Sequence, residues 1–257
     1  MKIKEAIQNL KNNIIVNSYY LKGSDQFLQE FFITKASDLI FKDKLVNKIL
    51  MSPDDMDSKS IIDQILVNDL FGSKKIFIIK NPTKLNNKVL EDLINYCKNP
   101  YDNYLLIIIN DDWMKKTIYL NKLESLLGYV DVQTPFINEM KKWIVYLFKI
   151  KGKEVDNKIV DTLLDIAGDS LSHINNEINK ICLFTGKRKI IRLKEIKQFS
   201  GWKKERQRWE FLLSIGEKKI DKSIFLAKSL ISNGDSMISL IYPLTALLQE
   251  ILYVKMN

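Results

Sequence analysis

The distribution of apolar residues along the first half of the chain predicts strands and helices in alternation. Five short segments rich in β-branched or aromatic residues have the length of strands, and longer segments with apolar residues every three or four positions, typical of amphipathic helices, separate them. Alternation of this kind favours a parallel sheet with right-handed helical crossovers, so we expect an α/β domain. The expected strands are Ser18–Lys22, Leu45–Met51, Ile76–Ile79, Tyr104–Ile109 and Tyr129–Val132.

The segment from Asp57 to Lys80 is the least ordinary part of this domain. An amphipathic helix runs into Leu70-Phe71-Gly72 and then directly into the all-apolar strand Ile76–Ile79. Gly72 leaves the large aromatic Phe71 at a helix end, where the chain must turn into the sheet. Phe71 therefore either closes the core or is offered to a partner. Leu70 follows Leu66 at a spacing of four, so it either extends the buried helix face or joins Phe71.

The pattern changes past Pro135, because every later segment has a helical period. We place one boundary near Thr134–Pro135 and a second near Ser200–Trp202, which predicts domains at 1–135, 136–202 and 203–257. The fold class is therefore α/β followed by all-α, with a small helical domain and a C-terminal helical domain. The expected helices are Glu139–Ile150, Asp156–Ala167, Ser170–Phe184, Leu193–Phe199 and three longer ones from about Arg206 to the end.

Composition narrows the class of protein. With 257 residues, 46% of them apolar, the chain is long enough for two or three domains with substantial cores. No uninterrupted apolar run reaches the roughly 18 to 20 residues that cross a bilayer, and the first residues lack a secretory apolar region, so we expect a cytoplasmic protein without a membrane partner. Cys97 and Cys182 fall in apolar helical patterns, which favours buried free thiols over a disulfide or a metal pair.

The net charge of +9 is concentrated in one stretch. Between Lys187 and Arg208 there are ten basic residues against two acidic ones, a local charge of +8. Such a cluster is either a solvated helix face or a surface that contacts phosphates. A free-standing nucleic-acid-binding module is therefore one alternative function. The candidate DNA or phosphate contacts are Lys187, Arg188, Lys189, Lys203, Lys204 and Arg206.

The sequence lacks the residues that a nucleotide site needs. A P-loop combines glycine-rich backbone amides with a lysine and a Ser/Thr hydroxyl, but the chain has Gly23-Ser24-Asp25-Gln26 after its first strand. The strand Ile76–Ile79 is followed by Lys80-Asn81-Pro82 instead of the acidic pair that would hold magnesium. We therefore expect no cofactor, no metal and no ATP hydrolysis by this chain.

Other polar residues have simple structural interpretations. Asp111-Asp112 follow a strand and could belong to a metal-dependent nuclease, the main enzymatic alternative, but no third carboxylate and lysine follow at the spacing of such sites. His173 is expected to be a surface or capping residue. Asp54, Asp55 and Asp57 are expected to cap the next helix and complement its dipole.

Several short motifs occur in an order that resembles one family. They are a strand followed by Gly23-Ser24-Asp25, then Asp69-Leu70-Phe71-Gly72-Ser73-Lys74-Lys75, then Asn81-Pro82-Thr83-Lys84-Leu85, then Asp165-Ile166-Ala167-Gly168-Asp169-Ser170-Leu171, and last Asn176-Glu177-Ile178-Asn179-Lys180-Ile181. In order and spacing they resemble the delta subunit of the bacterial DNA polymerase III clamp loader, over essentially the whole chain.

The resemblance implies an AAA+-like α/β domain with a degenerate nucleotide site, a helical lid domain and a helical collar-like domain. It implies an accessory subunit of a DNA-directed DNA polymerase (a nucleotidyltransferase complex) that has no catalytic site of its own. Such subunits open the sliding clamp during DNA replication by plugging a Leu-Phe pair into a pocket of the clamp, and the matching residues are Leu70 and Phe71. The implied partners are the sliding clamp (beta subunit), the other clamp-loader subunits and, indirectly or weakly, primed DNA.

The chain departs from the family at two places. Asn68 stands three positions before Phe71, where an apolar residue is common, so clamp affinity is expected to be lower. Relatives also continue beyond Asn257, so a shortened or reduced collar is expected. The last helices would then expose apolar residues that a partner normally covers. These residues are Ile238, Leu240, Ile241, Leu244, Leu247, Leu248 and Ile251.

Overall fold

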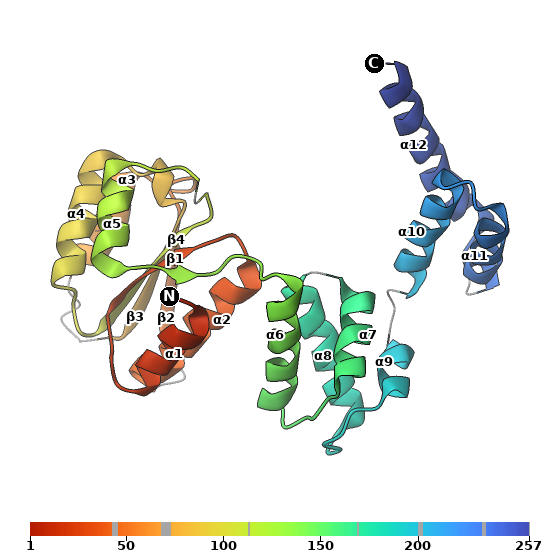
Figure 1. Ribbon diagram of the computed structural model, residues 1–257. Coiled ribbons are helices and arrows are strands. Elements are labelled where there is room, and N and C mark those ends of the chain that lie inside the picture. Colours follow the sequence, from red (N-terminus) through yellow and green to blue (C-terminus); the bar gives the residue numbers. More distant parts are fainter. Residues whose placement is uncertain are drawn as a thin grey trace. The chain divides into compact units, whose positions relative to one another are not determined.

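The structure of this protein is a computed structural model, shown as a ribbon in Figure 1. It describes residues 1–42, 46–67, 73–112, 114–168, 170–199, 203–232 and 235–256, apart from the side chains of residues 197–199, 203–207 and 232. The chain divides into two compact units, Met1–Phe136 and Ile137–Asn257. The first unit is α/β, and the described part of the second is helical apart from one isolated bridge between Glu154 and Ile190.

The first unit is built on a five-stranded sheet in which all strands are parallel, as the sequence predicted. The order is β2 (Asn47–Met51), β3 (Lys75–Lys80), β4 (Tyr104–Asn110), β1 (Ser18–Lys22) and β5 (Val130–Asp131). All seven residues of the central strand β4 are buried, which is why this strand reads as a continuous apolar run. The edge strand β2 is largely exposed, so its apolar pattern is weaker.

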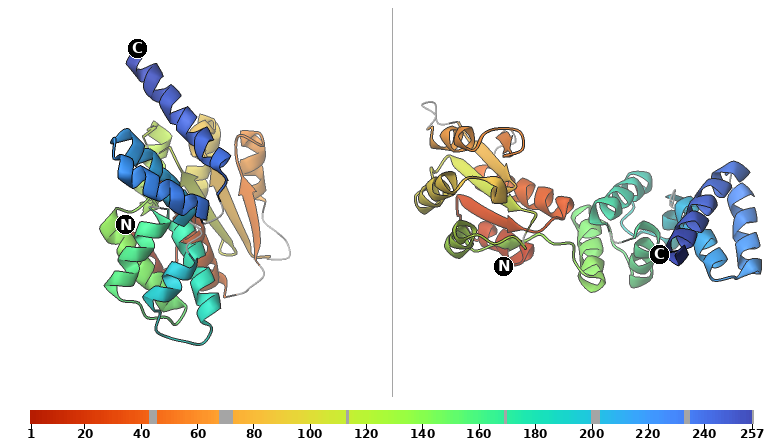
Figure 2. Two further views of the ribbon diagram at one scale, coloured as in Figure 1. Left: turned by 90° about the vertical axis from the view of Figure 1, so that its right-hand side faces the viewer. Right: turned by 90° about the horizontal axis from the view of Figure 1, so that it is seen from above.

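Helices cover both faces of this sheet (Figures 1 and 2). The helices α1 (Ile3–Lys11) and α2 (Gln26–Phe41) pack against each other, and the other face carries α3 (Ser58–Leu66), the short helix η1 (Pro82–Lys84), α4 (Asn87–Lys98) and α5 (Ile118–Leu127). Helix α1 was not among the expected elements, although its apolar residues have a helical spacing. Its stripe of Ile3, Ala6, Ile7 and Leu10 is buried, and the chain enters the sheet only after it ends.

The predicted caps are formed by specific aspartates. Asp25 accepts a hydrogen bond from the Leu28 amide at the start of α2. Asp57 accepts bonds from the amides of Lys59 and Ser60 at the start of α3, whereas Asp54 is hydrogen-bonded to Asn81 and Lys84. The hydrogen bonds to Ser60 contribute to holding the pKa of the Asp57 carboxyl below its ordinary value, which keeps the cap ionised.

The second unit contains seven described helices. Four of them, α6 (Ile137–Ile150), α7 (Asn157–Ala167), α8 (Leu171–Thr185) and α9 (Leu193–Phe199), pack on one another. In the remainder, α10 (Lys203–Gly216) packs against α11 (Ile220–Ser232) and α12 (Met237–Met256). The small core of these last helices is formed by Phe211, Leu226, Leu230 and Leu240. A division between residues 202 and 203 stays a prediction.

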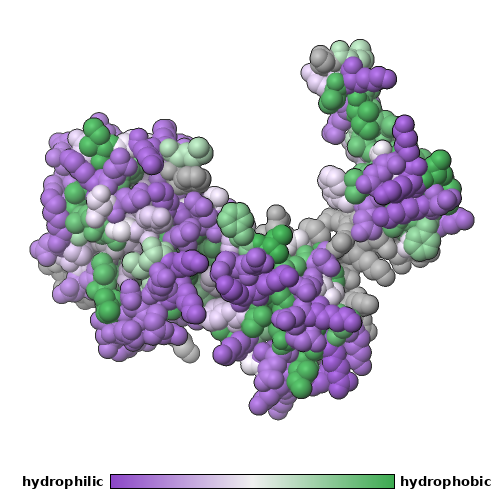
Figure 3. All heavy atoms as spheres, in the orientation of Figure 1, coloured by the Kyte–Doolittle hydropathy of each residue, from purple (hydrophilic) through white to green (hydrophobic). Residues whose placement is uncertain are grey.

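The apolar residues of α12 lie mostly at the surface. Leu240 is buried, whereas Ile238 is 78% and Tyr242 80% exposed. Apolar atoms reach the surface along this helix in Figure 3. By length and composition α12 is the one described helix that could cross a membrane, although it carries Pro243 in its interior. The expectation considered only uninterrupted apolar runs and was therefore too strict. A few polar residues interrupt α12, but its mean hydropathy still reaches that of a membrane span.

Both cysteines are free, as predicted, but only one is fully buried. Cys97 lies on the inner face of α4, and burial raises the pKa of its thiol to about 11. Cys182 on α8 is only partly buried, and burial raises its pKa as well. Both thiols are therefore largely protonated at neutral pH and poor nucleophiles.

Gly23 is required by the way the sheet closes after β1. Its φ is +134°, and a Cβ there would lie 2.4 Å from the Gln133 backbone nitrogen. The Gly23→Ala variant should therefore lose at least about 2 kcal/mol of unfolding free energy, because both the backbone angle and the neighbouring chain reject a side chain. Denaturant unfolding followed by circular dichroism measures this loss.

Gly152→Ala is the matched control for this prediction. Gly152 has φ +70°, but no atom lies within 4 Å of its added Cβ. Only the backbone cost of about 1 to 2 kcal/mol should then appear. Equal losses in the two variants would show that the close approach to Gln133 contributes nothing.

Candidate functional site

The predicted pair Leu70 and Phe71 lies in residues 68–72, outside the described residues. The structure does describe both flanks of this segment. Helix α3 ends at Leu66, Val67 has an extended backbone, and β3 begins at Lys75. The segment therefore connects a helix end to the first residue of a buried strand, as the sequence pattern predicted.

The described end of α3 is exposed. The helix ends at Leu66, and 44% of Leu66 and 65% of Val67 are exposed. Leu66, which the sequence pattern placed on the inner face with Ile61, Ile62 and Ile65, is thus at the boundary of the core.

The described residue after this segment, Ser73, lies near the amino edge of the sheet. Lys75, the first residue of β3, pairs with Tyr104, the first residue of β4. The loop that would form a nucleotide site follows β1 and therefore lies at the opposite, carboxyl edge.

The backbone amides after β1 are occupied by protein acceptors. The Gly23 amide donates to the Asn110 carbonyl at 3.1 Å, and the Asp25 amide donates to the Val132 carbonyl at 3.1 Å. A phosphate-binding loop needs such amides pointing at the ligand. The lack of a side chain at Gly23 thus allows residues 132 and 133 to pack close to it, whereas the glycines of a phosphate-binding loop allow a phosphate to approach.

Side chains at this edge add to the same network. The Gln29 side-chain amide donates to the Gly23 carbonyl at 2.8 Å and to Asp111 Oδ1 at 2.7 Å. Sequence reasoning missed Gln29, because its partners lie on different elements. Asp111, a residue of the nuclease alternative, is therefore committed to a structural hydrogen bond, and the Asp112 carbonyl accepts from the Lys115 amide in a turn.

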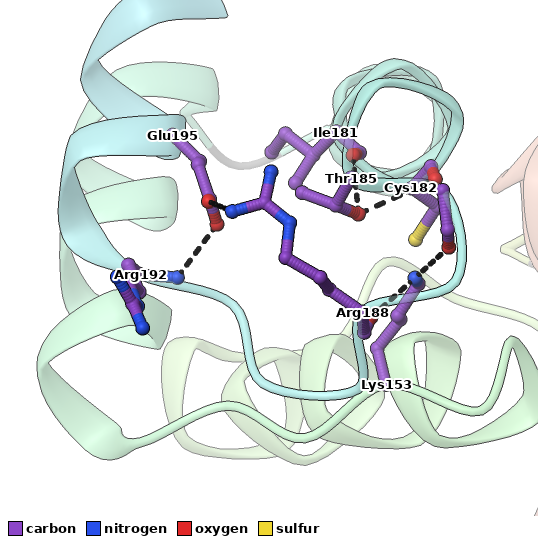
Figure 4. Close-up of polar contacts among 8 residues, drawn as sticks. Lys153, Ile181, Cys182, Thr185, Arg188, Arg192 and Glu195 are labelled. Atoms are coloured by element: carbon purple, nitrogen blue, oxygen red, sulfur yellow. Dashed lines mark hydrogen bonds and ion pairs between the residues drawn. The ribbon is translucent and has the colours of Figure 1, made fainter.

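The basic loop, residues 186–192, is fixed by contacts from its surroundings (Figure 4). Its anchor is Lys153, which is only 6% exposed and donates its Nζ to the carbonyls of Gly186 and Arg188. The Glu154 amide also donates to the Lys189 carbonyl at 2.8 Å. A buried ammonium at the end of α8 complements the carbonyl end of the helix. Lys153 was not among the predicted residues.

This arrangement separates the three predicted basic residues of the loop into two kinds. The Arg188 guanidinium forms an ion pair with the buried Glu195, which also accepts from the Arg192 amide. Lys187 and Lys189 are exposed at the surface of the loop. Arg188 is thus partly used to hold the loop, while Lys187 and Lys189 carry its positive charge outward. Phe184, Arg188, Lys194 and Glu195 line an open pocket of about 270 Å³ beside it.

The other predicted basic contacts lie at the start of α10. Lys203, Lys204 and Arg206 belong to this helix, but their side chains are outside the described part of the chain.

The remaining candidate residues have structural roles. His173 lies on α8 with its Nε2 3.7 Å from Glu177, and its backbone amide is capped by Ser170. Among the described residues, no group of three His, Cys, Asp or Glu side chains is arranged to hold a metal ion.

Comparison with known sequences identifies the relatives of this chain. Residues 19–133 match the family model described as DNA polymerase III, delta subunit. A relative from Aquifex aeolicus, named probable DNA polymerase III subunit delta, is 25% identical over 228 residues. The match covers 84% of this chain and 64% of the relative, so the chain spans slightly less than two thirds of that protein.

Solved structures show the same fold. The Bacillus subtilis DNA clamp loader delta protein superposes with a TM-score of 0.74 at 18% identity, over 95% of this chain and 76% of that one. A variant of Thermotoga maritima RuvB gives 0.50 at 13% identity, over 83% and 73%. These likenesses confirm the predicted AAA+-like fold class. With the sequence matches they also confirm the predicted resemblance to clamp-loader delta subunits, and they give no support to the nuclease or the free-standing nucleic-acid-binding module.

The occupied amides at the carboxyl edge generate a prediction about ATP. A ligand at 100 times its Kd raises the free energy of unfolding by about 2.7 kcal/mol, so a working ATP site would be visible in thermal unfolding. We expect millimolar ATP with magnesium to leave the melting temperature where sodium sulfate of equal ionic strength leaves it. A saturable increase seen with ATP and not with sulfate would contradict this expectation.

Proposed function

We propose that this chain, a relative of the DNA polymerase III delta subunits, is a clamp-loader subunit that binds the sliding clamp and opens its ring without hydrolysing ATP. The observation that carries the proposal is an AAA+-like fold in a chain that matches delta subunits. In this fold, the Gly23 and Asp25 amides of the loop after β1 are hydrogen-bonded to backbone carbonyls of the protein. A subunit of this kind would act on the clamp through binding energy.

Leu70 and Phe71 are the proposed clamp-binding residues. Two apolar side chains that fill a pocket contribute roughly 1.5 to 3 kcal/mol each, which is enough to anchor docking and to bias a strained ring interface. The proposal is supported by the end of α3 at Leu66 and by the exposure of Leu66 and Val67, the last described residues before the pair.

The C-terminal helices are the proposed contact with the other clamp-loader subunits. Apolar residues cover much of the surface of α12, and a surface of this kind usually has a partner. The Arg208–Asp235 ion pair, with Nη2 and Oδ1 2.8 Å apart, links α10 to the residues just before α12 and stabilises the packing of these helices. The proposed role places the chain in the cytoplasm of a bacterium.

The basic loop is proposed to contact the phosphates of primed DNA. Lys153 and the Arg188–Glu195 ion pair hold its backbone, so Lys187 and Lys189 are presented without further ordering. Phosphate contacts of this kind are independent of sequence and weaken steeply with salt. The contribution would add to clamp loading and would not replace it.

Removal of the proposed binding pair tests the main proposal. The Leu70→Ala and Phe71→Ala variants should each weaken binding of the purified sliding clamp by at least about tenfold, because each loses one buried apolar side chain. Surface plasmon resonance or a pull-down with the cognate clamp measures this. Thermal stability should change little.

Exposed residues elsewhere provide matched controls. Phe136→Ala removes a phenylalanine that is 90% exposed, and Leu183→Ala a leucine that is 82% exposed. Neither control should alter clamp binding. A large loss of stability in Phe71→Ala, with clamp affinity unchanged once the protein is folded, would place Phe71 in the core and refute the proposal.

Charge reversal tests the basic loop. The Lys187→Glu/Lys189→Glu variant should bind primed DNA more weakly and reduce the slope of log affinity against log salt by about 2, one for each lost phosphate contact. Fluorescence anisotropy of the full chain with labelled DNA gives both values. Lys149→Glu/Lys158→Glu makes the same change in net charge at exposed positions of α6 and α7. If the control reduces the slope equally, the effect is one of total charge and the loop is not a contact.

A further inference from the structure

The pocket beside the basic loop combines an aromatic ring with positive charge. Its volume is about 270 Å³, and the described residues that line it are Phe184, Arg188, Lys194 and Glu195. Phe184 stands one residue before the end of α8 and is 50% exposed. Lys194, on α9, is exposed as well. The fold thus brings an aromatic side chain from one helix and a cation from another to the same concave surface.

The acidic residue of the pocket does not oppose an anion. Glu195 is 1% exposed, and its Oε1 pairs with the Arg188 guanidinium, which extends to it from the loop (Figure 4). Its other oxygen, Oε2, accepts a hydrogen bond from the Arg192 amide at 2.9 Å. Both carboxylate oxygens are therefore bound to donors of the protein. The exposed Lys187 and Lys189 add positive charge beside the pocket.

Hydrogen bonds of the protein hold the frame of the pocket. The buried Lys153 donates to the carbonyls of Gly186 and Arg188. The Arg188 amide donates to the carbonyl of Thr185, the residue that follows Phe184, at 3.2 Å. The loop and the end of α8 are thus fastened to each other without a ligand. A preformed pocket loses little conformational freedom when a ligand binds.

An aromatic ring beside several cations fits a ligand that carries both a planar ring and phosphates. Every nucleobase has a face that stacks on an aromatic side chain, so this contact is tolerant of sequence. The volume lies just below the roughly 300 to 1,000 Å³ of pockets for drug-sized ligands, which leaves room for a single base. A base inside a duplex is stacked between its neighbours and cannot enter a pocket, so the ligand must be unpaired.

We propose that this pocket binds one unpaired base of single-stranded DNA, which stacks on Phe184 while Lys187, Lys189 and Lys194 contact the neighbouring phosphates. This inference rests on the proposed contact between the basic loop and DNA, and it specifies the ligand of that contact. The lysines alone would bind the phosphates of single and double strands alike. The aromatic ring adds a preference for the single strand.

Replacement of the ring tests the stacking. Phe184→Leu should weaken binding of a thymidine oligonucleotide of about ten nucleotides by at least about fivefold, because it removes the aromatic face on which a base stacks. The slope of log affinity against log salt should stay unchanged, since no phosphate contact is lost. Phe184→Tyr keeps the ring and should retain the affinity. Fluorescence anisotropy of the full chain measures both quantities.

Two comparisons separate the ring from charge and from stability. An abasic oligonucleotide of the same length keeps every phosphate, so Phe184→Leu should bind it as tightly as the unchanged chain does. Phe136→Leu replaces a phenylalanine that is 90% exposed in the other unit and should leave binding unchanged. Equal losses on the two oligonucleotides, or an equal loss in Phe136→Leu, would refute the inference. Full displacement of the oligonucleotide by an equal concentration of thymidine monophosphate would also refute it, because the site would then be one for free nucleotides.

The same measurements distinguish the two ways of failing. If Lys187→Glu/Lys189→Glu binds the thymidine oligonucleotide as tightly as the unchanged chain, the basic loop does not contact DNA and its proposed function is wrong. If that variant binds weakly while Phe184→Leu binds normally, the loop contacts phosphates and only the stacking on Phe184 is wrong.

Discussion

The α/β unit depends on the complete burial of β4 between β3 and β1. All seven residues of this strand are buried, and β3 and β1 pair with it in parallel over residues 104–109 and 106–110. A strand covered on both faces is held more firmly than any loop beside it, so what it carries at its two ends is placed accurately. At one end, Tyr101 and Tyr104 donate to the carbonyls of Leu66 and Val67, which precede the predicted clamp-binding segment. At the other end, the Asn110 carbonyl accepts from the Gly23 amide in the loop after β1, and Asp111 accepts from Gln29 of α2. One strand thus organises both edges of the sheet.

The two edges have opposite characters. At the carboxyl edge, Gly23, Asp25 and Gln29 donate hydrogen bonds to other protein groups. A nucleotide site at this position would instead need backbone amides that are free to bind phosphate. At the amino edge, the chain leaves α3 early and exposes Leu66 and Val67. The proposed function, binding of a partner through apolar side chains, uses the second edge and not the first.

The helical unit also combines a loop held by protein contacts with an exposed apolar surface. Four helices enclose a core of their own and hold the basic loop through Lys153 and Glu195, whereas α10, α11 and α12 share a small core and leave much of α12 uncovered. The apolar surface of α12 is of the kind that another protein or a bilayer covers. The proposed function implies a protein partner for this surface. The ion pair between Arg208 and the buried Asp235 links α10 to the residues just before α12.

The sequence by itself determined the alternation of strands and helices, the parallel sheet, the helical second half and the absence of P-loop residues, because these follow from local periodicity and from residues adjacent in the chain. It also indicated the family, through short motifs in order. It did not reveal α1, the limited burial of Cys182, or the roles of Gln29, Lys153, Tyr101 and Tyr104. Apart from α1, whose apolar spacing is local, each of these depends on residues elsewhere in the fold. A hydroxyl that meets a helix carbonyl across 35 residues leaves no local pattern, so only the tertiary structure decides it.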